Sequence, residues 1–168
     1  MNRRIFLFSA LAGASALAAR SASAHVQLPP EIDTYQLHYL TADAGPGATP
    51  LWMILDSTCD ICGGAYADLR SRAAVHDRAL VPYQLRFAPV GSSPETMRAA
   101  VRAFSAHSIE GFFQPDWEAQ TTEAAIQAVN GNNKAAWALP GYPAFIVRGK
   151  PIKMGYAGWS DFLDWLSA

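Results

Sequence analysis

Residues 51–62 read L-W-M-I-L-D-S-T-C-D-I-C, and this stretch decides the fold. Its first five residues form a continuous apolar run, which is typical of a strand buried on both faces. Apolar residues then recur at a spacing of four, as on the buried side of a helix: Ile61, Ala65, Leu69 and Ala73. Cys59 and Cys62 therefore lie where a buried strand passes into a helix.

The flanking segments extend this unit. Residues 80–88 predict a second strand, which completes a β-α-β unit around the cysteines, and the alternating residues 34–40 predict a strand before it. Residues 92–139 predict an all-helical insertion. Its first helix begins with Ser93 as the cap and Pro94 at the first position, and residues 130–132 (N-G-N) are predicted to end a later helix.

The C-terminal part predicts two strands and a helix. Residues 144–147 form one strand, and residues 151–154 return antiparallel to it. Ser160 is predicted to cap the last helix, with three apolar residues facing inward: Phe162, Leu163 and Leu166. The order β-α-β, helical insertion, β-β-α around a C-x-x-C pair is typical of a thioredoxin-like α/β fold.

The N-terminus has the features of an export signal. Arg3 and Arg4 precede the apolar residues 5–19, and a small-residue ending, A-S-A, follows at residues 22–24. The apolar run is shorter than the roughly 20 residues of a spanning helix, which disfavours a membrane anchor. We expect a signal peptide over residues 1–24 and a single mature domain over residues 25–168. The Arg-Arg pair leaves the Sec and twin-arginine routes both open, and either leads to the periplasm.

Composition excludes several classes of function. The chain has 168 residues and a net charge of −1, so no basic field indicates nucleic acid. Cys59 and Cys62 are its only cysteines; a bridge between them would close too small a loop to add much stability, and a zinc site would want further ligands. A redox pair remains, and nothing indicates a cofactor or a metal.

A cysteine at the start of a helix is suited to thiol exchange. Free N–H groups and the helix dipole favour the thiolate of Cys59, while Cys62, one turn on, can resolve a mixed disulfide. The negative charge of Asp60 opposes thiolate formation, although an acid in the first turn also stabilises the helix. Asp56 can relay a proton to or from Cys62, but a cap on the turn is the favoured interpretation.

Pro143 is the second element of the predicted site. In a thioredoxin-like fold the loop opposite the C-x-x-C pair carries a cis proline, and the backbone of the preceding residue, Tyr142, can pair with an extended substrate peptide. A trans proline at the start of a strand is the alternative.

These motifs resemble the catalytic domain of the DsbC/DsbG disulfide isomerase family. Residues 55–62 are similar to the family's strand, Asp, Thr and C-x-x-C, and residues 141–149 with the later Gly-Tyr pair at 155–156 are similar to its G-T-P-A segment and ending. Tyr142 replaces the usual Thr, and the Asp60-Ile61 dipeptide is unfamiliar in either subgroup. The N-terminal dimerisation domain of the family is not recognised, so we expect a monomer with weak isomerase activity.

The resemblance implies an exported thiol:disulfide oxidoreductase that acts through Cys59 and Cys62, with substrate contacts at Tyr142 and Pro143. Its expected partners are cysteine-containing envelope proteins and a membrane or periplasmic thiol redox partner. The charge of Asp60 favours a reductase or isomerase direction over strong oxidation. A peptide-binding or chaperone module in envelope assembly is the alternative, and a metal-handling role through the two cysteines and a His ranks third.

Overall fold

A four-stranded sheet forms the centre of the computed structural model, which describes residues 32, 34–41 and 49–168. The strand order is β2-β1-β3-β4. β1 runs parallel to β2, in register from Thr49 opposite Tyr83 to Asp56 opposite Val90, whereas β3 is antiparallel to both β1 and β4. The strands are β1 (Thr49–Asp56), β2 (Tyr83–Val90), β3 (Ala144–Val147) and β4 (Lys153–Met154).

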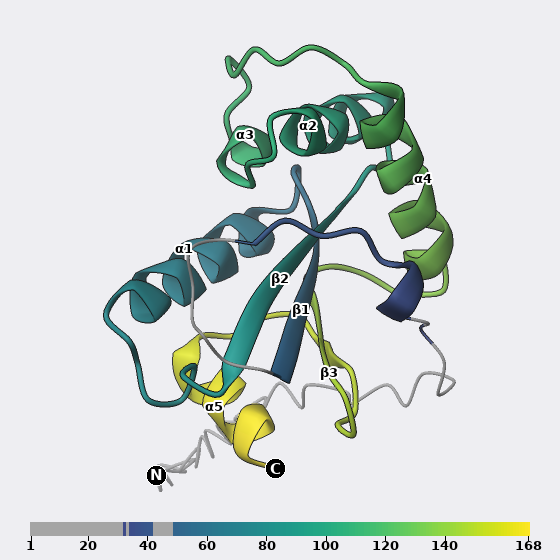
Figure 1. The fold of residues 1–168 in the computed structure, drawn as a ribbon. Coiled ribbons are helices and arrows are strands. Elements are labelled where there is room, and N and C mark those ends of the chain that lie inside the picture. The colour runs from purple at the N-terminus through teal and green to yellow at the C-terminus, as the bar shows by residue number, and fades with distance from the viewer. Residues whose placement is uncertain (1–31, 33, 42–48) are drawn as a thin grey trace, which may run out of the picture.

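Helices cover both faces of the sheet and one of its ends (Figure 1). One face packs against α1 (Asp60–Ala74) and α5 (Trp159–Ser167). The other packs against the segment that follows the 3-10 turn η1 (Thr34–Gln36) and against the end of α4 (Glu123–Ala136). Between β2 and β3 the chain also forms α2 (Pro94–Ser105) and α3 (Glu110–Phe113), which lie at one end of the sheet in Figure 1.

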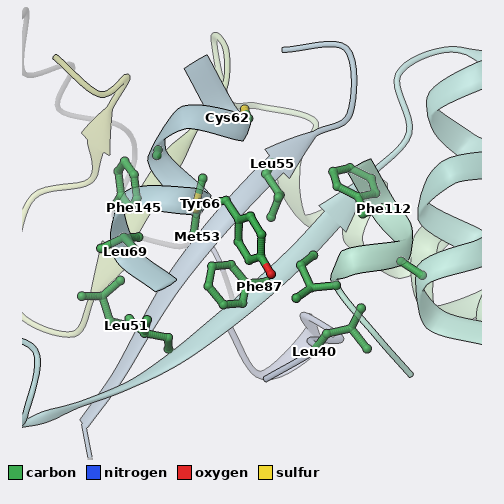
Figure 2. Close-up of a cluster of buried hydrophobic side chains, with 14 of the residues drawn as sticks. Leu40, Leu51, Met53, Leu55, Cys62, Tyr66, Leu69, Phe87, Phe112 and Phe145 are labelled. Atoms are coloured by element: carbon green, nitrogen blue, oxygen red, sulfur yellow. The ribbon is translucent and has the colours of Figure 1, made fainter. Parts of the chain in front are cut away.

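The central strand β1 contributes to two separate hydrophobic cores. Leu51, Met53 and Leu55 point into the larger core, where Figure 2 shows them with Tyr66 and Phe87. The alternate residues Trp52 and Ile54 point into the smaller core on the other face. This double burial explains the continuous apolar run and confirms the prediction of a strand covered on both sides.

The local signals at two helix starts are confirmed. Cys59 is the N-cap of α1, directly after the turn that follows β1. Ser93 caps α2 in a reciprocal capping box: its hydroxyl accepts from the Thr96 N–H, and the Thr96 hydroxyl accepts from the Ser93 N–H. Pro94 occupies the start of α2, where a missing N–H costs nothing.

The predicted strand over residues 34–40 is wrong. Its first half is the turn η1, and strand pairing occurs at Leu40, which bridges to Phe87. The cause lies far along the chain, at Asn132 in α4. The Asn132 side chain accepts from the His38 N–H at 2.8 Å and donates to the His38 carbonyl at 3.0 Å, so a side chain takes the bonds that a neighbouring strand would supply.

The predicted end of α4 at residues 130–132 is also wrong, since the helix continues to Ala136. Asn132 is fully buried, and its amide also donates to the Pro89 carbonyl at 2.9 Å. Asn133 bonds both backbone groups of Gly91. Both amides therefore serve long-range contacts, and neither caps the helix.

The last helix differs from the prediction in its cap and its inward face. α5 begins at Trp159 with Gly158 as its N-cap, so Ser160 is not the cap. Phe162 and Leu166 are buried as predicted, but Leu163 is only half-buried. Trp165 is buried in addition, packed against the rings of Phe145 and Phe162, and its indole N–H donates to the Pro151 carbonyl at 2.8 Å. None of the helices among the described residues combines the length and the apolar character needed to cross a membrane.

We expect Asn132→Ala to lower the free energy of unfolding by about 2–4 kcal/mol. The substitution removes three hydrogen bonds and leaves backbone groups of His38 and Pro89 without these partners. Urea unfolding followed by circular dichroism measures this. Asn130→Ala is the matched control, since Asn130 is exposed on the same helix and its loss is expected to cost less than about 0.5 kcal/mol. Equal stabilities of the two variants would contradict the role given to Asn132.

Candidate functional site

Cys59 sits at the junction of β1 and α1, with its side chain partly exposed. Its sulfur accepts a hydrogen bond from the Cys62 N–H at 3.2 Å. The Cys59 thiol also lies 3.5 Å from the Tyr142 carbonyl oxygen, to which it donates. The first turn of a helix carries free N–H groups and the positive end of the dipole, so negative charge on a sulfur is stabilised there.

Cys62 lies one turn further along α1 and is fully buried. Both cysteines are free thiols in the structure. Burial raises the pKa of the Cys62 thiol strongly; the hydrogen bond with Cys59 and the negative charges of Cys59 and Asp56 add to this, against a lowering by a hydrogen bond to the Asp56 backbone. The pair is therefore asymmetric, with an accessible sulfur beside a buried, protonated one.

Asp56 is the last residue of β1 and is 3% exposed. One carboxylate oxygen accepts from the backbone N–H and the hydroxyl of Thr58, at 2.9 and 2.8 Å. The other accepts from the hydroxyl of Ser92 at 2.5 Å and from its N–H at 3.4 Å. Asp56 thus caps the turn that leads to Cys59 and ties it to the loop before α2.

The two residues between the cysteines lie on the surface. Asp60 is exposed at the first position of α1, and Ile61 is 52% exposed. An exposed apolar side chain next to the sulfur of Cys59 offers a contact for an apolar group on a partner. Two residues beyond Cys62, Gly64 is exposed, and a Cβ added there would meet nothing within 4 Å. The surface of α1 is therefore open to a partner at this position.

The segment that leads into β3 completes the site, although it lies 83 positions after Cys59 in the sequence. The Tyr142–Pro143 peptide bond is cis. Pro143 is buried, and its carbonyl accepts from the Gly155 N–H at 2.8 Å, which holds the segment against β4. The Tyr142 side chain is half-buried, and burial, followed by the charges of Asp56 and Cys62, raises the pKa of its hydroxyl.

The structure thus brings five of the six residues singled out in the sequence together: Asp56, Cys59, Cys62, Tyr142 and Pro143. Asp60 adjoins them on the exposed side. Ser92 was missed, because nothing in a Ser-Ser-Pro helix start indicates that its first serine bonds a carboxylate 36 positions earlier.

Phe113 of α3 was also missed. Its ring stacks on Tyr66 at 5.1 Å, and a Cβ added at Gly63 would lie 3.9 Å from it, so α3 covers the first turns of α1. An ion pair between Arg70 and Glu110 joins the same two helices. Across the described ranges, no three His, Cys, Asp or Glu side chains lie together as a metal site would require.

No protein-family model and no curated protein sequence matches the chain. Several solved structures do match. A periplasmic thioredoxin-like protein from Salmonella enterica serovar Typhimurium is 13% identical, with 84% of this chain and 97% of that chain covered and a TM-score of 0.61. The catalytic domain of Proteus mirabilis ScsC is 12% identical, covering 87% of this chain and 94% of that chain at a TM-score of 0.58.

The thiol-disulfide exchange protein alpha-DsbA2 from Wolbachia pipientis is similar as well, at 11% identity and a TM-score of 0.54, covering 78% of this chain and 86% of that chain. At these identities the likeness concerns the fold, and it confirms the predicted thioredoxin-like α/β architecture. These structures are described as thioredoxin-like, ScsC and DsbA2 proteins, so they do not single out the DsbC/DsbG family.

The asymmetry of the two thiols leads to a prediction for alkylation by iodoacetamide. At pH 7.5 we expect Cys59 to be labelled first and Cys62 to stay largely unlabelled, because Cys62 is buried and its pKa is raised. In Cys59→Ser, labelling of Cys62 should still be rising at pH 10, whereas an ordinary thiol with a pKa of about 8.5 approaches its plateau there. Mass spectrometry of peptides measures both rates.

Urea-unfolded protein is the control for this experiment, since both thiols should then react at ordinary rates. Equal labelling of Cys59 and Cys62 in the folded protein at pH 7.5 would show that the buried thiol is accessible and would contradict the assignment.

Proposed function

We propose that the chain is an exported thiol:disulfide oxidoreductase that exchanges disulfides with envelope proteins through Cys59 and Cys62. The observation that carries the proposal is the position of the Cys59 sulfur, which accepts from the Cys62 N–H and lies beside the Tyr142 carbonyl. A partly exposed sulfur at a helix start, next to a buried second thiol, is the arrangement that thiol exchange requires.

The reaction proceeds in two exchanges. The Cys59 thiolate attacks one sulfur of a client disulfide, which forms a mixed disulfide and releases the other client sulfur as a thiolate. Cys62 then loses its proton and attacks the Cys59 sulfur, so that the client leaves with both its cysteines reduced and the chain holds a Cys59–Cys62 disulfide. The same steps in reverse oxidise a client, and a membrane or periplasmic thiol partner resets the pair.

The second exchange depends on deprotonation of a thiol whose pKa is raised in the dithiol form. Once Cys59 is bonded to a client, the negative charge of its thiolate is gone, and that part of the opposition to ionisation of Cys62 goes with it. The Asp56 carboxylate interacts electrostatically with Cys62, and we assign it the transfer of this proton besides its role as turn cap.

The client is held at the Tyr142–Pro143 segment. The backbone of Tyr142 pairs with an extended stretch of the client next to Cys59, in the manner of an added strand. The exposed Ile61 contacts apolar client side chains on the other side of the sulfur. Asp60 tunes Cys59 away from strong oxidation, so we favour a reductase or isomerase-like direction and a DsbC-like assignment.

Export is part of the proposal. The signal peptide that the sequence predicts at residues 1–24 lies outside the described residues, and one of the similar structures is described as periplasmic. We therefore place the mature domain, residues 25–168, in the periplasm, where its clients are cysteine-containing envelope proteins. We also propose that it acts as a monomer, which light scattering tests directly.

A second function is favoured by the groove between α2, α4 and residues 117–121. A peptide-binding or chaperone module in envelope assembly would use such a surface, with redox chemistry secondary. The double variant Cys59→Ala/Cys62→Ala discriminates the two: if it supports the same cellular phenotype as the native protein, the enzymatic proposal is wrong in the cell.

For the enzymatic proposal, we expect the purified protein to reduce insulin in the presence of a dithiol reductant, as turbidity of the released chains shows. Cys59→Ser should reduce this rate to background, because the attacking sulfur is lost. Cys62→Ser should lose turnover and accumulate a mixed disulfide with the client, visible on a non-reducing gel, because the resolving sulfur is lost.

Ser167→Ala is the matched control, since Ser167 is exposed at the last position of α5, and it should reduce insulin like the native protein. Full activity in Cys59→Ser would overturn the assignment of the nucleophile, and a mixed disulfide on Cys59→Ser but not on Cys62→Ser would exchange the roles of the two cysteines.

A further inference from the structure

A groove of about 860 Å³ lies in the helical segment between β2 and β3, and the two thiols have no part in it. It runs between one side of α2, the start of α4 and the loop over residues 117–121. Its apolar lining comes from all three parts: Met97, Val101, Trp117 and Ile126. The groove is open, whereas small-molecule sites enclose most of their ligand, so its form suits a stretch of polypeptide.

One end of the groove is fixed to the C-terminal ends of β1 and β2, where the chain leaves β1 for the turn before Cys59. Met97 packs against Gly91, where an added Cβ would lie 2.4 Å from the Met97 Cα. Gly91 directly follows Val90, which pairs with Asp56 in the register of β1 and β2. Asn133 bonds the backbone of Gly91 and contacts the Met97 sulfur, so this end of the groove is held in place.

The same end is linked to the turn before Cys59 by the carboxylate of Asp56. Ser92, beside Gly91, donates to Asp56, and Asp56 accepts from Thr58. From Met97 to Arg102 the groove follows α2 for about 7–8 Å, at 1.5 Å per residue. The groove therefore begins near the turn that carries Cys59 and leads away from it. It has room for two or three client side chains.

The charges on the groove are uneven. Arg98 and Arg102 line it from α2, and Glu118 lines it from the loop, so positive charge is in excess by one. Arg102 is held by a bond from its Nε to the Gly111 carbonyl at 3.0 Å, while Arg98 is exposed. A partner with apolar side chains and a negative charge complements this lining.

We infer that the groove binds an apolar, acidic segment of the client polypeptide, at a distance in the client from the disulfide that Cys59 attacks. This inference rests on the proposed function, because it names the class of client that the same protein takes. A second copy of the chain fits less well, since a symmetric pairing would set the arginines of one groove against those of the other.

Binding is measured apart from redox chemistry in the Cys59→Ala/Cys62→Ala variant of the full protein. The probe is a fluorescein-labelled peptide that alternates Leu and Phe with Asp and contains no cysteine, and its counterpart carries Lys in place of Asp. Fluorescence anisotropy should show the acidic peptide binding at least roughly tenfold more tightly, and Arg98→Glu should reverse this preference. Because Arg98 is exposed, its charge reversal leaves the packing intact.

Trp117→Ala should weaken both peptides roughly tenfold or more, as the loss of a large aromatic contact does at an interface. Trp137→Ala is the matched control, because Trp137 is 82% exposed and lies outside the groove. In the protein with both cysteines, Trp117→Ala should raise KM for insulin by a larger factor than it raises KM for a small aromatic disulfide.

The inference is overturned if neither peptide binds, if Arg98→Glu leaves their order unchanged, or if light scattering shows a dimer that Trp117→Ala converts to a monomer. Failure of the proposed function gives a different result: peptide binding persists, while neither insulin nor the small disulfide is reduced. A loss of both disulfide activities in Trp117→Ala would show damage to the fold instead, and Arg98→Glu then decides the matter.

Discussion

The burial of β1 on both faces is the constraint on which the rest of the domain depends. β1 pairs with β2 on one side and with β3 on the other, and its side chains alternate between the two hydrophobic cores. A strand fixed in this way has no freedom of register, because a shift of one residue would exchange its two sets of buried side chains. The point at which β1 ends, at Asp56, is therefore determined, and so is the place where Cys59 enters the first turn of α1.

Asp56 converts this fixed end into a fixed site. A buried carboxylate needs hydrogen bonds, and it finds them on two segments, at Thr58 in the turn before Cys59 and at Ser92 in the loop before α2. The same carboxylate thus positions the redox turn and the start of the helical insertion. The negative charge near Cys62, which opposes ionisation of that thiol, accompanies this arrangement.

The helices between β2 and β3 do more than join two halves of the sheet. α3 covers the start of α1 through Phe113 and an ion pair. α2 and α4 carry a groove whose first residue, Met97, is held against Gly91 at the end of β2. If the groove binds clients as we propose, thiol chemistry and client binding use different elements, and both are held in place through Asp56 and the loop before α2.

The sequence by itself determined the elements whose cause is local. The apolar run of β1, the period-four face of α1, the capping box of α2 and the C-x-x-C pair each follow from residues close together in the chain. Tertiary structure decided what depends on distant partners. Residues 34–40 alternate like a strand, yet Asn132 takes the backbone bonds of His38. The N-G-N segment looks like a helix end, yet the amide of its last residue, Asn132, bonds backbone groups of other segments and the helix continues. Polar side chains such as Asn132 and Ser92 can bond either locally or across the molecule, and only packing determines which of these bonds forms.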